Sequence, residues 1–524
     1  MVERIKAELG AALKEIPIGE ADYRAKGYHL FAEVSASDLK NVARFFDDRG
    51  FYLAVIACVD YKEYLELVYI FANHASLCRV KIALKVDPVK PVAPTLSAIF
   101  DCAYWYEREI REFYGVLFDG HPNMTYLFLH AGIDFYPLRK EKIPVTDEDK
   151  KALGAFRPGE GEDTFSINLG PQHPSTHGVL RVVLKMDGEY IEDAQPVLGY
   201  LHRMHEKMAE NRGYVQFYAN TGRMDYLGAL AFNLGYVTAV ERLCGITVPD
   251  RANYVRVIAT ELNRIASHLM WLGAYLADLG ALTPFLFVFD DREQINDILE
   301  AVTGSRLTYA YFRFGGLFND VDDAFVTGTR AFIERMKGRF DLYQKLVTGN
   351  VIFINRTRGI GVITKERARK YGVSGPVLRA AGIPMDLRKM EPCAAYGEMD
   401  FAVPVGARGD VLDSYNVRVR EMENALQIIE QALAKLSEGP IMAEKVPKKL
   451  KPPKGDIYHT VETPRGELGI YIVSDESDTP YRMKWRVPSF SNLMIFPELA
   501  RGCLLADAVA ILGSLDLVIP EIDR

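Results

Sequence analysis

The sequence predicts two domains: an α+β domain that ends near residue 139, and a mostly helical domain that starts near residue 165. Short apolar strands mixed with helical stretches before residue 139 predict the first domain. Long segments with helical periodicity after residue 165 predict the second. Between them, residues 140–164 are polar, charged and contain Pro and Gly, which is typical of a linker.

The elements of the first domain are apolar runs bounded by polar residues. The strands are expected at residues 51–60, 64–73 and 79–86. Helices are expected at residues 38–50 and 95–115, where apolar residues recur at helical spacing. Strands and helices of this size can enclose one core of their own.

The second domain begins with alternating residues, VLRVVLKMDGEY, which predict strands. Long helical segments follow, up to a Lys/Pro-rich break at residues 446–456 that is expected to be a solvated loop. A late β region at residues 466–475 and 481–490 precedes a last apolar helix. No internal repeat or low-complexity segment interrupts this order.

Composition excludes several classes of protein. The 524 residues are 49% hydrophobic and 25% charged, which is ordinary for a globular chain and sufficient for two or three domains. A net charge of −7 gives no electrostatic reason to expect nucleic acid. The charged, amphipathic start is unlike a signal peptide. The six cysteines are scattered singly, so neither a zinc site nor an iron–sulfur cluster is expected from local pairs, and reduced cytoplasmic thiols are expected.

The two longest apolar runs, residues 274–289 and 503–520, are interrupted by acidic residues. Asp278 lies in the first run, and Asp507 and Asp516 lie in the second. A membrane span needs about 20 apolar residues without such charges. Both runs are therefore expected to be buried segments of a soluble or peripheral chain.

One helix, residues 259–280, carries an unusual polar stripe. Its members lie on one face because they are spaced four, three, four and three residues apart: Arg264, His268, Trp271, Tyr275 and Asp278. An apolar stripe adjoins this face, so the helix is expected to be buried on more than one side. A buried carboxylate at Asp278 must then be paired or protonated.

Several other motifs carry little information by themselves. His173 and His177 are four residues apart in NLGPQHPSTHG, but Pro171 and Pro174 argue against the helix that would let them share a metal. The carboxylates of WYEREIRE are expected to form a salt-bridged helix face. No phosphate-binding glycine motif opens a helix. The residues alone thus predict a soluble, two-domain, α-rich protein.

Longer motifs resemble a known family. Six segments, in this order, resemble the 49 kDa subunit of respiratory complex I: GPQHPSTHGVLRVVLKMDGE, GYLHRMHEKMAE, GRMDYL, ELNRIASHL, GGLFND and GSLDLVIPEIDR. WYEREIREFYGVLFDGHP and YPLRKE resemble the 30 kDa subunit, and some bacteria carry the two as one fused chain. The resemblance covers nearly everything after residue 30 except the linker. It implies a second domain like the large subunit of [NiFe] hydrogenases, with small flanking β-sheets.

The hydrogenase lineage is the sharpest alternative. Such an enzyme needs four thiolates, from one CxxC near GRMDYL and another near the C-terminus, because nickel and iron prefer soft ligands. Gly222–Tyr226 contains no cysteine, and the C-terminal motif reads SLDLVIPEIDR, so this alternative is rejected. Two alternatives remain: a ferredoxin- or deazaflavin-dependent relative of complex I, and a membrane-bound hydrogenase-type large subunit that has lost its nickel–iron site. A pure assembly scaffold would not need to retain His177, Tyr226 and Asp278.

The resemblance implies roles for individual residues. Tyr226 and His177 correspond to proton donors to the quinone headgroup, and Asp278 to the acidic partner of that histidine. Arg223 corresponds to an arginine beside the terminal iron–sulfur cluster, and His173 to a residue that shapes the quinone-site loop. Two residues depart from the family: Thr308 stands where histidine is common, and Met204 where glycine is usual.

The same resemblance implies the setting of the chain. Quinone is expected as substrate, with no metal or flavin bound by this chain alone and the iron–sulfur cluster on a small partner subunit. Other peripheral-arm subunits and a membrane subunit at the quinone entrance are expected partners. The expected location is the cytoplasmic face of the bacterial inner membrane. NADH, ferredoxin or reduced deazaflavin could each supply electrons through other subunits.

Overall fold

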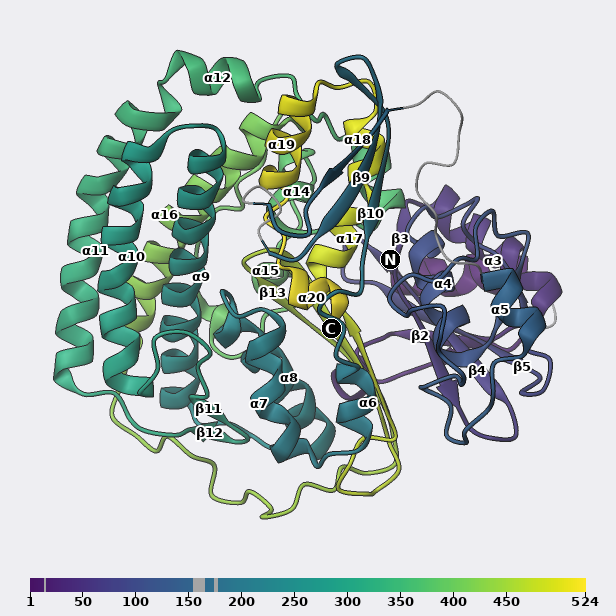
Figure 1. The fold of residues 1–524 in the computed structure, drawn as a ribbon. Coiled ribbons are helices and arrows are strands. Elements are labelled where there is room, and N and C mark those ends of the chain that lie inside the picture. Colours follow the sequence, from purple (N-terminus) through teal and green to yellow (C-terminus); the bar gives the residue numbers. More distant parts are fainter. Residues whose placement is uncertain (14–15, 154–164, 174–177) are drawn as a thin grey trace.

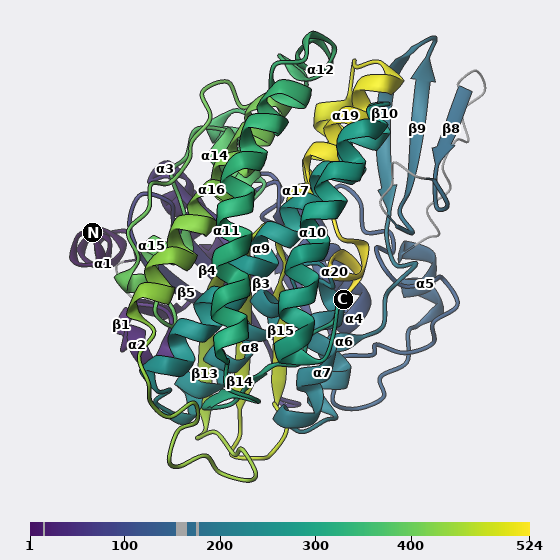
Figure 2. The same ribbon diagram turned by 90° about the vertical axis from the view of Figure 1, so that its left-hand side faces the viewer.

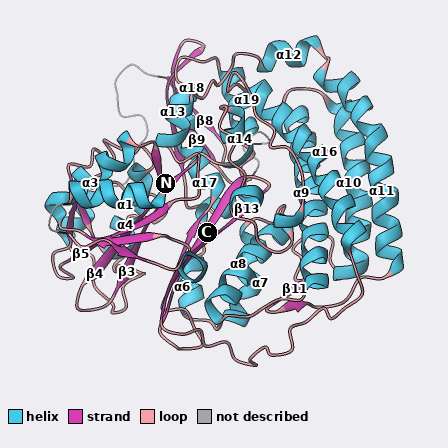
Figure 3. Cartoon of the chain, turned by 180° about the vertical axis from the view of Figure 1, so that it is seen from behind, coloured by secondary structure: helices cyan, strands magenta, loops and turns pink. Residues whose placement is uncertain are grey.

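The computed structural model describes residues 1–13, 16–153, 165–173 and 178–524. An N-terminal region built on a five-stranded sheet lies on one side, and a group of long helices lies on the other (Figure 1). A three-stranded sheet from the last quarter of the chain lies between them (Figures 1 and 3). The predicted mixture of an α+β region followed by a helical region is therefore observed.

The N-terminal sheet has the order β1-β2-β5-β4-β3. Its strands are β1 (Gly19–Glu20), β2 (Leu30–Glu33), β3 (Phe51–Asp60), β4 (Leu65–Asn73) and β5 (Arg79–Val86). Neighbours are antiparallel except β2 and β5. All ten residues of β3 are buried, which requires cover on both faces of the sheet. The three predicted strands are confirmed to within one residue.

Helices and two short strands complete this region. They are α1 (Val2–Ala12), α2 (Tyr23–Lys26), α3 (Ala36–Asp48), α4 (Ala103–Tyr114), β6 (Val92–Pro94) and β7 (Leu117–Asp119). The prediction of a helix over residues 95–115 is wrong for its first third. Thr95 and Leu96 instead fold back onto α4, where both donate hydrogen bonds to the Glu107 carboxylate (2.5 and 2.7 Å). The side chain of the helix thus fixes the loop that precedes it.

The prediction that the carboxylates of α4 form a salt-bridged helix face holds for Glu109, but its partners do not come from the helix itself. Glu109 is buried and forms ion pairs with Lys484 and Arg524, far away in the sequence. Glu112 is buried too and accepts hydrogen bonds from three consecutive backbone N–H groups, residues 127–129. Local spacing could not show these partners because they come from other parts of the chain.

The region between the two predicted domains is partly helical. Helix α5 (Asp147–Leu153) lies within the predicted linker, and residues 154–164 lie outside the described part of the chain. A three-stranded antiparallel sheet follows, in the order β10-β9-β8. Its strands are β8 (Phe165–Leu169), β9 (Arg181–Asp187) and β10 (Tyr190–Val197).

The remaining chain is mostly helical up to residue 435. Its longer helices are α7 (Tyr214–Met224), α8 (Ala229–Cys244), α9 (Asp250–Asp278), α10 (Leu282–Thr303), α11 (Asp323–Tyr343) and α16 (Val411–Lys435). Shorter elements connect them: α6 (His205–Glu210), β11 (Phe312–Arg313), β12 (Gly316–Leu317), η2 (Gln344–Thr348), α12 (Val351–Thr357), α13 (Lys365–Lys370), α14 (Gly375–Ala380), α15 (Leu387–Met390) and η3 (Tyr396–Glu398). The long helices α9, α10, α11 and α16 lie side by side (Figures 1 and 2).

Helix α9 confirms the prediction of burial on more than one side. Its polar stripe is buried up to Tyr275, and only Asp278 at the end of the helix is half-buried. His268 contacts Glu421 of α16 (3.2 Å), and the Trp271 indole donates to the carbonyl of Gly513 (2.7 Å). The polar side therefore faces other elements of the protein, where these groups find partners.

The apolar run 274–289 is not buried as predicted. Helix α9 ends at Asp278 and α10 starts at Leu282, so the run forms the turn between two antiparallel helices. Leu282 and Leu286 are 66% and 65% exposed. The start of α10 lies at the same end of the helices as α12 (Figure 1).

The C-terminal part of the chain supplies the last sheet and the last four helices. It contains β13 (Gly455–Thr463), β14 (Gly466–Ser474), β15 (Arg482–Arg486), α17 (Pro488–Met494), α18 (Phe496–Ala500), α19 (Leu505–Ser514) and α20 (Ile519–Asp523). Buried polar contacts join its sheet to the N-terminal region, including Arg79 with Thr460 of β13 (2.6 Å) and Tyr52 with Glu467 of β14 (2.9 Å). None of the helices in the described ranges is long and apolar enough to cross a membrane.

Candidate functional site

Tyr226 lies on a tight turn between α7 and α8. Helix α7 ends at Met224, and the next residue, Asp225, accepts hydrogen bonds from the backbone N–H groups of Leu227 (3.1 Å) and Gly228 (2.9 Å). A Cβ atom on Gly228 would come within 2.6 Å of the Asp225 carboxylate, so glycine is required there. The turn holds Tyr226 half-buried between two fixed neighbours.

A buried arginine, Arg465, holds this turn in place. Arg465, from the hairpin between β13 and β14, contacts the Asp225 carboxylate at 2.6 Å and the Ser267 hydroxyl of α9 at 3.1 Å. The Asp516 carboxylate lies 3.5 Å from the same guanidinium. Burial disfavours the charged form of Arg465, but the two carboxylates outweigh this and hold its pKa above the ordinary value. Sequence reasoning missed Arg465 because the residues it holds in the turn and in α9 are about 200 residues or more away along the chain.

The environment of Tyr226 favours its neutral form. Burial raises the pKa of the Tyr226 phenol, while the positive charge of Arg465 opposes the rise. A phenol with a raised pKa keeps its proton at neutral pH. Tyr226 can therefore donate a hydrogen bond to an acceptor that approaches its exposed side.

Asp278 lies on the same helix that anchors the Tyr226 turn, but not beside it. Asn263 of α9 holds the turn by donating to the carbonyl of Leu227 (2.9 Å). Asp278 follows about four helical turns later, which is roughly 22 Å along the axis. Trp271 and Tyr275, whose rings stack at 5.3 Å, lie between these two points. The structure thus anchors the Tyr226 turn at Asn263, about four helical turns before Asp278, and shows no contact between Tyr226 and Asp278.

The histidine loop is described only in part. His173 is exposed and forms an isolated antiparallel bridge with Gly178. A Cβ atom on Gly178 would lie 3.2 Å from the Ile519 side chain, so the returning end of the loop runs close to α20. His177, and with it the predicted pairing with Asp278, lies outside the described residues.

Arg223 is exposed at the last turn of α7. Its guanidinium donates to the carbonyl of Ala219 one turn earlier. Beside it, the segment that carries Thr308 packs on α7: a Cβ atom on Gly222 would lie 3.4 Å from the Tyr309 carbonyl oxygen. That oxygen also accepts a hydrogen bond from the Asn233 amide (2.7 Å). The segment that carries Thr308 therefore packs against the last turn of α7, the turn that also carries Arg223.

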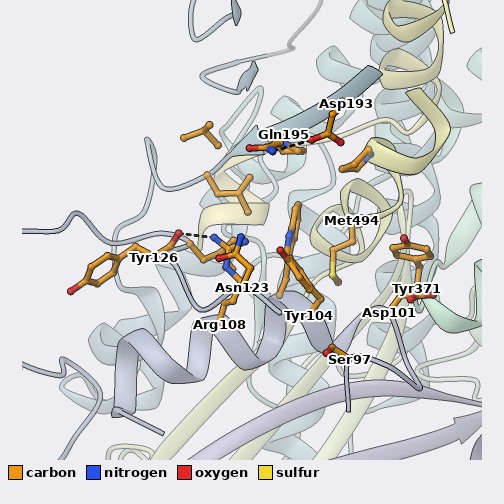
Figure 4. Close-up of a pocket in the computed structure, with 17 residues that line it drawn as sticks. Ser97, Asp101, Tyr104, Arg108, Asn123, Tyr126, Asp193, Gln195, Tyr371 and Met494 are labelled. Atoms are coloured by element: carbon orange, nitrogen blue, oxygen red, sulfur yellow. Dashed lines mark hydrogen bonds between the residues drawn. The ribbon is translucent and has the colours of Figure 1, made fainter. Parts of the chain in front are cut away.

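No group of three or more His, Cys, Asp or Glu residues in the described part of the chain could hold a metal ion. The described residues do enclose a cavity of about 340 Å³, between α4, β10 and the α17–α18 segment (Figure 4). The predicted site residues that the structure describes all lie outside its lining.

Comparisons with known proteins decide the family. Residues 32–148 match the family described as respiratory-chain NADH dehydrogenase, 30 Kd subunit. Residues 278–452 and 444–524 match the 49 Kd subunit of the same enzyme. The chain is 37% identical to one of the fused C/D subunits of NADH-quinone oxidoreductase from Aquifex aeolicus, with 100% of this chain and 99% of the relative covered. The chain belongs to the fused C/D subunits of NADH-quinone oxidoreductase.

The D part of this C/D chain has relatives of higher identity. The D subunit of NADH-quinone oxidoreductase from Syntrophobacter fumaroxidans is 59% identical over 363 residues, covering 69% of this chain and 97% of the relative. The D subunit from Clostridium beijerinckii is 49% identical, covering 69% of this chain and 98% of the relative. The predicted recognition of a fused 30 kDa/49 kDa subunit is thereby confirmed. The chain is a component of an oxidoreductase complex of several subunits.

The structure explains one departure of this C/D chain from its family. Met204 has φ +54° and ψ +43°, in the left-handed region that a residue with a Cβ atom rarely adopts. Glycine would enter this region without steric cost, which fits the glycine that the family resemblance implies at this position. Met204 adopts it directly before α6, where its thioether sulfur lies 2.8 Å from the His202 ring.

Proposed function

We propose that this C/D chain forms part of the quinone-binding and reduction site of its complex, next to the terminal iron–sulfur cluster of a neighbouring small subunit. The observation that carries the proposal is the position of Tyr226. Its phenol is half-buried, protonated and fixed by a turn that Asp225, Arg465 and Asn263 hold. Such a group is suited to donate to a quinone carbonyl.

The residue types fit the chemistry of quinone reduction. The reaction takes two electrons and two protons, and charge that develops on the carbonyl oxygens needs donors held in a dry site. Tyr226 supplies one donor. His177 supplies the other, and the negative charge of Asp278 stabilises its protonated imidazole. His173 shapes the loop that carries His177.

One electron at a time arrives from the cluster on the partner subunit. Arg223 is exposed at the end of α7, where its charge would favour the reduced cluster when that subunit binds. The segment that carries Thr308 packs against this turn of α7, and Thr308 has no ionisable group. A cluster beside this chain should therefore have a midpoint potential that depends little on pH.

The apolar end of the helices is suited to a membrane partner. Four exposed apolar side chains belong to the start of α10 and to α12: Leu282, Leu286, Val351 and Ile352. Asp278 lies at this end too, because α9 ends there. Exposed apolar side chains gathered at one end favour burial against another subunit. We assign this end to the membrane subunit at the quinone entrance.

The test compares wild-type membranes with the variant Tyr226→Phe. Quinone reduction driven by NADH should fall roughly 10²-fold because the phenol hydroxyl is lost without a change of shape. Reduction of ferricyanide, which accepts electrons upstream of the quinone, should not change. Tyr190→Phe, at an exposed tyrosine of β10, is the matched control and should match wild type in both assays. Equal quinone rates in Tyr226→Phe and wild type would remove Tyr226 from the site.

A further inference from the structure

The 340 Å³ cavity is bordered by three separate parts of the chain (Figure 4). Helix α4 of the N-terminal region supplies Tyr104, Trp105 and Arg108 to one wall. Strand β10 forms the opposite wall, and Met494 with Pro497 closes one side. The volume lies in the range of binding pockets for small ligands or side chains, which begins at about 300 Å³.

The β10 wall is a strand edge and not a strand face. Six consecutive residues, 193–198, line the cavity. Side chains alternate between the faces of a strand, so a cavity on one face would be lined by every second residue only. Lining by consecutive residues means that the cavity runs along the backbone of β10.

This stretch of the edge has open backbone groups. Strand β10 is the outer strand of its sheet, with β9 on its inner side. On its outer side Ile191 exchanges backbone hydrogen bonds with Gly502 and Cys503 (2.7 and 2.9 Å). Beyond Ile191, no backbone hydrogen bond in the described chain joins residues 193–198 to a segment on the outer side. Pro196 has no N–H and offers an added strand only its carbonyl oxygen, while the other open backbone groups of this edge can pair with such a strand.

Arg108 lies across the cavity from this edge and forms no ion pair with any of the described residues. Its three hydrogen bonds end on uncharged oxygens: the Thr125 carbonyl (3.0 Å), the Thr125 hydroxyl (3.0 Å) and the Tyr126 carbonyl (2.7 Å). A half-buried guanidinium in this situation favours binding of a carboxylate, which forms short charge-assisted hydrogen bonds.

The two acidic residues that line the cavity, Asp193 and Asp101, do not prevent a carboxylate from binding to Arg108. The Asp193 carboxylate accepts from the Gln195 amide (2.9 Å) and lies 3.3 Å from the Arg501 guanidinium. The other acidic residue is Asp101. Burial raises the pKa of its carboxyl group, and the positive charge of Lys370 opposes this rise. Tyr104, Trp105 and Met494 leave an apolar space between the edge and Arg108.

We propose that this cavity binds an extended peptide segment of another subunit of the complex, which adds as a strand to the 193–198 edge of β10. One apolar or aromatic side chain of the segment fills the space between Tyr104, Trp105 and Met494. A carboxylate of the same segment binds Arg108. Strand addition of this kind takes its affinity from the backbone and its specificity from side-chain pockets. The inference does not depend on the location of the quinone site.

The test starts from the assembled complex. A photo-crosslinking benzoylphenylalanine replaces Gln195, which is exposed and lines the cavity, or Glu192, which is exposed on the same strand outside it. Position 195 should form an adduct with a segment of another subunit that contains an Asp or Glu residue, and position 192 should not. Adducts only within this chain, or only with a lipid or other small molecule, would overturn the proposal.

The second step uses a synthetic peptide of the crosslinked segment as probe for the full chain. Its affinity should fall at least tenfold in Gln195→Trp, which blocks the cavity, and stay unchanged in Glu192→Trp. Replacing the peptide carboxylate by its amide should weaken binding to wild type but not to Arg108→Gln. Equal loss in both chains would show that the carboxylate does not bind Arg108. Equal affinity of both tryptophan variants would overturn the proposed site.

Discussion

At the scale of single residues, Met204 has an unfavourable backbone conformation. Met204 has a left-handed backbone that costs a residue with a Cβ atom about 1–2 kcal/mol. Its thioether contacts the ring of His202, which itself donates to the Asp523 carbonyl (2.6 Å). The side chain thus contributes contacts that partly offset the backbone cost.

A comparison of two substitutions separates the backbone from the side chain. Met204→Ala and Met204→Gly both remove the thioether, but only glycine relieves the left-handed strain. The glycine variant should therefore be more stable than the alanine variant by about 1 kcal/mol, measured by urea unfolding. At Met208, inside α6, the order should reverse because glycine weakens an ordinary helix position. The same order at both positions would contradict the argument.

At the scale of single elements, α4 shows what the sequence could and could not predict. Strands β3, β4 and β5 were predictable because each is an apolar run between polar ends. The start of α4 was not, because Thr95 and Leu96 are held by Glu107 from within the helix. Nor were the partners of Glu109, since a periodic pattern gives no information about Lys484 and Arg524, which lie hundreds of residues away in the sequence.

The candidate site also contains residues that the sequence could predict and one, Arg465, that it could not. Tyr226 and Asp278 were located by motifs, and the polar face of α9 was readable from its period. Arg465 carried no local signal, although it fixes the Tyr226 turn. The β13–β14 hairpin brings Arg465 into contact with Ser267 and Asp225, which lie about 200 and 240 positions earlier in the chain.

Helix α4 also predicts how stability changes with pH. Burial raises the pKa of Glu107 to about 8, although the hydrogen bonds from Leu96 and Thr95 oppose this. A carboxyl whose pKa is raised by folding favours the folded state only while it is protonated. Stability should therefore be lost as the pH rises from about 4.5, where the unfolded chain ionises, through about 8. Glu107→Gln, a neutral mimic, should flatten this part of the curve in urea unfolding.

The exposed Glu141→Gln should leave the pH curve of the wild type unchanged, because the Glu141 side chain is 67% exposed and its ion pair with Lys62 (3.9 Å) is on the surface. Parallel curves for Glu107→Gln and wild type would show that the buried carboxyl does not control this pH range.

At the scale of the whole molecule, the two regions are joined by buried charges and the helices end in an apolar surface. Arg79 of β5 contacts Glu391 at 2.6 Å, and Glu109 of α4 pairs with Lys484 of β15. Removing one member of such a pair leaves a buried charge, which costs about 3–5 kcal/mol. The N-terminal region is therefore fixed to the rest of the chain, and a partner that binds either region positions both.

The membrane contact that we propose for the apolar end of the helices can be tested by one substitution. Ile352 of α12 is 73% exposed, so Ile352→Asp should leave the fold intact. In a complex, the carboxylate would be buried against another subunit without a partner, which is costly. The fraction of this chain that sediments with membranes should therefore fall at least tenfold, a loss of about 1.4 kcal/mol or more. Val89→Asp, at an 82% exposed position between β5 and β6, is the matched control and should sediment as wild type does. Equal sedimentation of both variants would move the membrane contact away from α12, whereas loss in both would show that added negative charge alone weakens attachment.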